Sequence, residues 1–78
     1  PVTTMLYDLP EPGHTRLVIY DLLGRQVQTL VDQPLDAGFY RMQWDGRNAQ
    51  GQIVGAGIYF YQIQANGFIR TRKMLLVK

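Results

Sequence analysis

The sequence predicts an all-β protein, an antiparallel two-sheet sandwich of the immunoglobulin or fibronectin type III kind with about seven strands. Apolar and polar residues alternate along most of the chain, which is typical of half-buried strands. Turn-forming combinations of Gly, Pro, Asn and Asp recur at intervals of about ten residues, as in all-β sandwiches. The 78 residues are 46% hydrophobic and 12% aromatic, enough for one small core, so residues 1–78 form a single domain.

The first two strands follow from this alternation. The first places three apolar side chains inward (Met5, Tyr7, Leu9) and ends at the turn of residues 10–13. The second directs Thr15, Leu17 and Ile19 inward, so Arg16, Val18 and Tyr20 are expected on the opposite face.

Residues 21–25 then predict a hairpin turn in which Gly24 takes a positive φ. A strand over residues 26–31 and a loop over 33–38 follow. The spacing of Leu23, Val27, Leu30 and Val31 also fits a helix. The β-branched residues and Pro34 favour the strand, and the helix remains the alternative for this segment.

The second half alternates more clearly. Inward-facing sets are expected in a fourth strand (Tyr40, Met42, Trp44) and in the strand before Asn66 (Tyr59, Tyr61, Ile63, Ala65). Asn66-Gly67 favours a type I′ turn, so residues 68–77 should pair antiparallel with 58–65. Residues 74–77 are apolar on both faces and predict a covered strand end. A short strand near residues 52–54 completes about seven.

Composition excludes most chemistry. The chain contains no Cys, no Ser, one His and one Glu, which removes thiol and serine nucleophiles and Cys-containing zinc sites. We therefore expect no enzyme, no cofactor and no metal. A net charge of +2 is too small to indicate nucleic acid, and no apolar run is long enough to cross a membrane. The domain is expected to be a monomer.

Two motifs invite a functional interpretation and favour a structural one. Residues 45–51 loosely resemble an oxygen-rich cation loop, but Asp45 is its one acid and Arg47 opposes a cation. We expect a turn in which Asp45 and Asn48 bond nearby backbone N–H groups. His14 has no second His or Cys as a partner, so a surface histidine is the expected role.

Two aromatic residues are expected to face outward. Strand alternation directs Trp44, Tyr59 and Tyr61 into the core, whereas Tyr20 and Phe60 point away from it. Exposed aromatic rings can stack on sugars. A carbohydrate-binding accessory module of a secreted polysaccharide-degrading enzyme, with surface polysaccharide as its partner, is therefore one hypothesis.

Charge is distributed unevenly along the chain. Residues 1–45 have a net charge of −3 and residues 46–78 a net charge of +5, with four cations in the last nine residues. This pattern fits either a charged edge strand or a basic tail that a receptor recognises.

The whole chain resembles a known bacterial family. The similarity runs through VTTMLYDLPE (2–11), IYDLLGRQV (19–27), AGFY (37–40), WDGRN (44–48), GAGIYFY (55–61) and TRKMLLVK (71–78). In this order the motifs resemble the C-terminal sorting domains of the type IX secretion system. Those domains are similar to the Ig-like domain of flagellar hook-capping proteins.

The resemblance implies a non-catalytic Ig-like module of a larger secreted protein. Outer-membrane secretion machinery would be its partner, and it would be secreted or attached to the outer surface after passing through the periplasm. The family's signal would be carried by Gly57, Tyr59, Gly67, Lys73 and Lys78. A structural Ig-like domain of a hook-capping-like protein is the remaining alternative.

Overall fold

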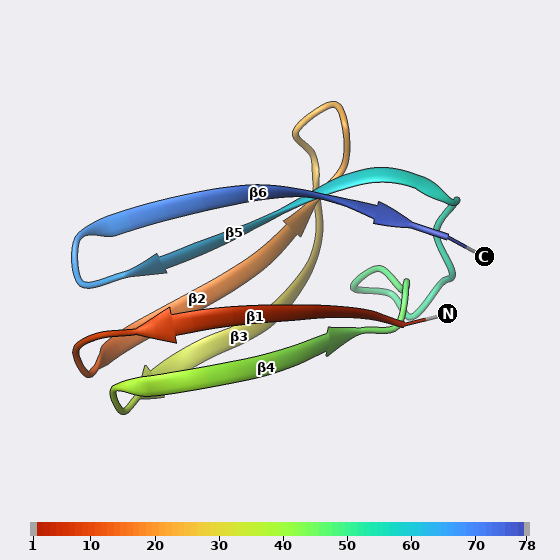
Figure 1. Cartoon of the computed structure of the whole chain (residues 1–78). Helices are drawn as coiled ribbons and strands as arrows, with labels where there is room; N and C mark the ends of the chain where they lie inside the picture. Colours follow the sequence, from red (N-terminus) through yellow and green to blue (C-terminus); the bar gives the residue numbers. More distant parts are fainter. Residues whose placement is uncertain (1, 78) are drawn as a thin grey trace.

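Six strands in two antiparallel sheets make up the computed structural model, which describes residues 2–77 (Figure 1). The strands are β1 (Thr3–Leu9), β2 (Gly13–Tyr20), β3 (Gln26–Leu35), β4 (Gly38–Trp44), β5 (Gly57–Ala65) and β6 (Phe68–Leu76). The smaller sheet contains β1 and β4, and the larger has the order β3-β2-β5-β6. The predicted all-β sandwich is confirmed.

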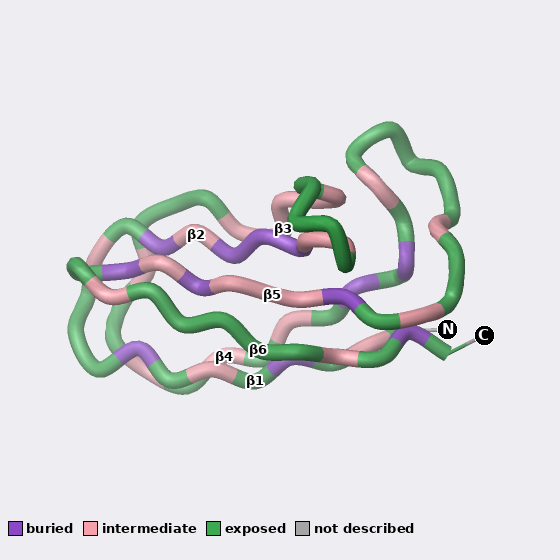
Figure 2. Tube along the Cα trace, turned by 90° about the horizontal axis from the view of Figure 1, so that it is seen from above, coloured by how far each residue is buried: buried purple, intermediate pink, exposed green. Residues whose placement is uncertain are grey.

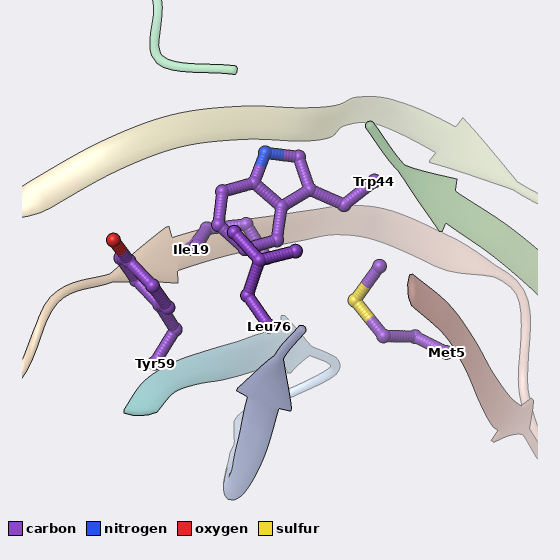
Figure 3. Packing of buried hydrophobic residues seen from close by; sticks show 5 residues of the cluster. All are labelled: Met5, Ile19, Trp44, Tyr59 and Leu76. Carbon is purple, nitrogen blue, oxygen red and sulfur yellow. The ribbon is translucent and has the colours of Figure 1, made fainter. Parts of the chain in front are cut away.

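Side chains from both sheets meet in one core. The alternation predicted for β1, β2, β4 and β5 directs four buried side chains between the sheets, and Leu76 of β6 joins them in one cluster: Met5, Ile19, Trp44, Tyr59 and Leu76 (Figure 3). Half-buried side chains of β3, β4, β5 and β6 pack around this cluster. Each sheet has one apolar face, and the apolar face of one sheet is buried by packing against that of the other.

The predicted hairpin between β5 and β6 is present and pins a second turn. Asn66 and Gly67 have φ values of 50° and 80°, as a type I′ turn requires. The Asn66 side chain also donates a 2.9 Å hydrogen bond to the carbonyl oxygen of Glu11, in the β1–β2 connection. A Cβ atom on Gly13 would lie 2.1 Å from Asn66 Oδ1, so a larger residue at position 13 would displace the Asn66 side chain from this place.

The strand count and β3 differ from the sequence prediction. Six strands replace about seven, because residues 52–54 contribute an isolated bridge between Arg47 and Ile53. The alternative helix over Leu23–Val31 is wrong: residues 26–35 form β3, which passes through Pro34. Pro34 is tolerated because β3 is an edge strand and needs no second ladder partner.

Burial follows the sheet positions of the strands (Figure 2). Val18, expected on the outer face, is only 1% exposed because β2 is a central strand and Val18 lies between Thr29 and Gln62. The end of β6, expected to be covered, is open, with Leu75 60% and Val77 63% exposed. An edge strand has a neighbour on one side only, which leaves its outward side chains uncovered.

Candidate functional site

Three of the predicted surface residues lie in one row on the outer face of the larger sheet. Tyr20 of β2 is directly opposite Phe60 of β5, and Phe60 is directly opposite Lys73 of β6. The three strands are adjacent in the sheet (Figure 1). Side chains at paired positions point to the same face and lie about 4.5–5.5 Å apart at Cβ. The register therefore joins the aromatic candidates to one of the candidate signal residues.

A shallow hollow of about 390 Å³ accompanies the two aromatic rings. Tyr20 and Phe60 are half-buried, and Gln62 and Thr71 extend the same surface toward β6. Gln62 Nε2 donates a 3.1 Å hydrogen bond to Thr71 Oγ1. Two aromatic rings beside amide and hydroxyl groups are a chemistry that can hold a sugar, by stacking and by hydrogen bonding.

The β2–β3 turn forms one wall of this hollow. Asp21 Oδ1 accepts hydrogen bonds from the backbone N–H groups of Leu23 and Arg25, each 2.9 Å long, and Arg25 Nε donates to Asp21 Oδ2 at 2.8 Å. The backbone bond from Arg25 is the main reason that the pKa of Asp21 lies below its ordinary value. Both oxygens of the Asp21 carboxylate thus accept hydrogen bonds within their own turn. Gly24 in this turn has the predicted positive φ, 83°.

Tyr59, a candidate signal residue, has a structural role in the core. Its ring contacts Trp44 edge to face, and its hydroxyl donates a 2.6 Å hydrogen bond to the carbonyl oxygen of Gly55. A tyrosine near the start of a strand that bonds backbone a few residues upstream is the tyrosine corner of immunoglobulin-like sandwiches.

The two candidate glycines also serve the backbone. Gly57 has a φ of 146° at the first position of β5, and Gly67 has its φ of 80° in the β5–β6 turn. Both values lie in a region that favours glycine over other residues. Turn and strand geometry therefore accounts for both positions.

Lys73 differs from these three residues. Its side chain is exposed on the outer face of β6 and forms no ion pair with any residue in the 2–77 range. Lys78 lies outside the described residues. The structure therefore brings Lys73 together with Phe60 and Tyr20, and separates it from Gly67 at the far end of the strand.

The two motifs with expected structural roles behave as predicted. Asp45 Oδ1 accepts from the N–H of Arg47 at 3.1 Å, and Asn48 Oδ1 accepts from the N–H groups of Gln50 and Gln52 at 3.0 Å each. His14 is exposed and lies 2.6 Å from Asp32 Oδ1. Across residues 2–77, no three His, Asp or Glu side chains gather where they could hold a metal ion.

The cations of the basic tail lie on two different faces of β6. Alternation along β6 separates its cations: Lys73 faces outward, whereas Arg70 and Arg72 face the side of the smaller sheet, opposite Ile63 and Tyr61. The net charge of the tail does not show this division, whereas the period of two along a strand predicts it. Neither arginine has an ion-pair partner among the described residues.

Fold and surface together define an immunoglobulin-like β-sandwich domain. Within residues 2–77, no helix is long and apolar enough to cross a bilayer. A sequence model described as "FlgD Ig-like domain" matches residues 3–67, most of the chain. The chain therefore belongs to the FlgD Ig-like domain family.

A solved structure supports the same fold. FlgD from P. aeruginosa superposes with a TM-score of 0.78 over 97% of this chain, at 23% sequence identity. This chain spans 61% of the length of that FlgD chain. A search of curated protein sequences finds no match.

Proposed function

We propose that this chain is a non-catalytic structural module, an Ig-like domain that makes protein contacts in a hook-capping-like protein. The family match over residues 3–67 carries this proposal. The chemistry of the domain agrees with it. Its carboxylates are scattered over the described chain, and their hydrogen bonds hold turns and neighbouring strands together. The Asn66 side chain likewise joins two turns.

The alternative role, an export address read by outer-membrane secretion machinery, has less support from the geometry. Of the five residues that this role assigns, Tyr59 is held by the tyrosine corner, and Gly57 and Gly67 by their φ angles. Architecture is a sufficient reason for all three. Among the four of these residues that the structure describes, Lys73 alone is exposed on the sheet surface and has no evident role in folding.

An export assay distinguishes the two roles. The chain is fused to the C-terminus of a soluble reporter in a bacterium that has type IX secretion, with an established sorting domain as positive control. We expect the reporter to remain in the cell. Two results together would overturn the structural role and establish the address: the reporter is exported, and Lys73→Glu abolishes this export although the variant stays folded. Such export would also place the domain at the cell exterior.

A specific observation favours one second candidate, carbohydrate binding. Tyr20 and Phe60 share a hollow with Gln62 and Thr71, next to one another on the outer face. Titration with soluble polysaccharides tests this candidate, with Phe60→Ala as the variant. The matched control is Phe39→Ala, because Phe39 is a phenylalanine of β4 that is 89% exposed and lies outside this hollow. Saturable binding that Phe60→Ala alone removes would establish a sugar site.

A further inference from the structure

Both strands of the smaller sheet have an open edge, and the edge of β1 borders a hollow that reaches the larger sheet. β1 pairs with β4 over its full length, from Thr3 opposite Trp44 to Leu9 opposite Gly38. No other described strand pairs with β1, because this sheet contains two strands. The second edge of β1 therefore presents backbone N–H and C=O groups that another extended segment can pair with.

The edges of the larger sheet are protected, and that of β1 is not. β3 carries Pro34 and Asp32 and has register shifts against β2, whereas β6 carries three cations (Arg70, Arg72, Lys73). Proline, charge and irregular register all hinder the addition of a strand. β1 has seven residues in unbroken register, with Asp8 as its one charged side chain.

The open edge borders a groove between the two sheets. A hollow of about 480 Å³ is lined by Leu6, Tyr7 and Asp8 of β1 and by Phe68, Arg70 and Arg72 of β6. The β6 residues belong to its inner face, since they are opposite Ala65, Ile63 and Tyr61. Although they face inward, Arg70 and Arg72 are exposed. The smaller sheet therefore leaves Arg70 and Arg72 on the inner face of β6 uncovered, next to an edge that lacks a strand, whereas Leu76 farther along that face is buried.

Charge indicates what this groove accepts. Arg70 and Arg72 occupy alternate positions of β6, about 6.5–7 Å apart along the strand. Neither has an ion-pair partner in the described chain, although both face the gap between the sheets. Two adjacent guanidinium groups favour carboxylates, which they can bind through paired hydrogen bonds.

We propose that the groove between β1 and β6 binds an extended acidic segment of a partner protein by strand addition. The segment pairs with the free edge of β1 and directs every second side chain toward β6. Two of these side chains are acidic, at positions i and i+2, and face Arg70 and Arg72. The next one at the Phe68 end is apolar, because Phe68 and Ile63 line that part of the groove.

A second copy of this chain is a poorer occupant. The inward side chains of its own β1 include Met5 and Leu9, which are already buried in the core of that copy. Its β1 could join the edge but could not also place side chains on Arg70 and Arg72. The acidic segment of a different protein therefore fits the groove better.

A peptide titration tests this proposal on the intact chain. The probe is a nine-residue peptide of β-forming residues with Glu at two alternate positions and Ile at the next, and the control peptide carries Lys in place of both Glu residues. We expect amide chemical-shift changes in β1 and β6 of the isotope-labelled domain with the acidic peptide alone. Added salt should weaken this binding, because exposed charges are screened.

Two charge-reversal variants give the decisive comparison. Arg70→Glu with Arg72→Glu should weaken the binding at least tenfold, whereas Lys73→Glu on the opposite face of the same strand should leave it unchanged. Circular dichroism verifies that both variants are folded. Absence of shifts at millimolar peptide, or equal losses in both variants, would refute the proposal. So would a concentration-dependent dimer that involves β1, which would assign the edge to a second copy. This binding assay is independent of the export assay, so either proposal can fail alone.

Discussion

The rings of Trp44 and Tyr59 contact each other edge to face across the sandwich, with centroids 5.1 Å apart and planes inclined by 69°. Trp44 ends β4 in one sheet and Tyr59 lies near the start of β5 in the other. Each ring also bonds the backbone of the connection between these strands. Trp44 Nε1 donates to the carbonyl oxygen of Arg47 at 2.9 Å, and Tyr59 donates to that of Gly55. The pair therefore joins the two sheets and anchors the ends of the longest connection.

Replacing Trp44 should remove a large part of the stability of the domain. Its side chain is fully buried, and Trp44→Ala should lower the free energy of unfolding by about 3–5 kcal/mol through lost contacts and a cavity. A domain of this size has a total stability of roughly 4–12 kcal/mol. Urea unfolding of both proteins, followed by circular dichroism, measures the loss. In the unmutated domain the emission of the single tryptophan should also shift to longer wavelength on unfolding. Trp44→Ala with an unchanged urea midpoint would contradict the packing described.

Removing one hydroxyl isolates the tyrosine corner. Tyr59→Phe keeps the ring contact with Trp44 and loses the bond to Gly55, which should cost about 1 kcal/mol. Tyr40→Phe is the matched control, since Tyr40 makes a similar bond to the carbonyl oxygen of Asp36 in an exposed place. Water can replace that bond, so its loss should be smaller. If urea unfolding gives the same loss of stability for Tyr59→Phe and Tyr40→Phe, the hydrogen bond of the tyrosine corner contributes no more than an exposed one.

Two glycines with open surroundings separate backbone strain from packing. A Cβ atom at Gly67 or at Gly55 would meet no heavy atom within 4 Å, but Gly67 alone of the two has a positive φ, 80°. Gly67→Ala should therefore lower the stability by about 1–2 kcal/mol. Gly55→Ala should change it by less than about 0.5 kcal/mol. Thermal unfolding of both variants tests this ranking, and the reverse order would be inconsistent with the type I′ turn.

Stability should fall at alkaline pH because of Tyr7. Burial, and then the neighbouring Tyr40, raises the pKa of Tyr7 above its ordinary value of 10.0. The two rings are stacked with centroids 5.3 Å apart. Above pH 10 the unfolded chain loses the Tyr7 proton while the folded chain keeps it, so the free energy of unfolding decreases until the raised pKa is passed.

The variant Tyr7→Phe removes this titrating group and should flatten the alkaline decline. Urea unfolding between pH 8 and 11 compares the two proteins, and the difference between their curves reports Tyr7 alone. Parallel curves would mean that the folded and unfolded chains hold this proton equally.

The sequence was sufficient where a local rule decides the structure. Asn66-Gly67 specified its own hairpin, because few residue pairs accept positive φ at two successive positions. The alternation around Ile19 and Trp44 correctly gave the core face of their strands. Leu17, correctly predicted to face inward, is buried but lies outside the cluster of Trp44, which Met5 and Leu76 complete.

Other features depend on which strands become neighbours, and local patterns do not contain this information. Val18 is buried because β2 is central, and Leu75 is exposed because β6 is an edge. Tyr20 and Phe60 were correctly placed on an outer face, but the register that joins them to Lys73 emerges from three strands together. The groove beside Arg70 likewise requires both sheets to be positioned.

The start of β1 and the end of β6 lie at the same end of the sandwich (Figures 1 and 2), which determines how the domain responds to force. A pull that separates these two ends acts first on the pairs Thr3–Trp44 and Gly57–Leu76. The hydrogen bonds of each ladder then break one after another from that end, instead of resisting together as they do when strands are sheared lengthwise. Tension across its two ends should thus peel β1 and β6 away at low force, while the central pair β2–β5 keeps its hydrogen bonds longest.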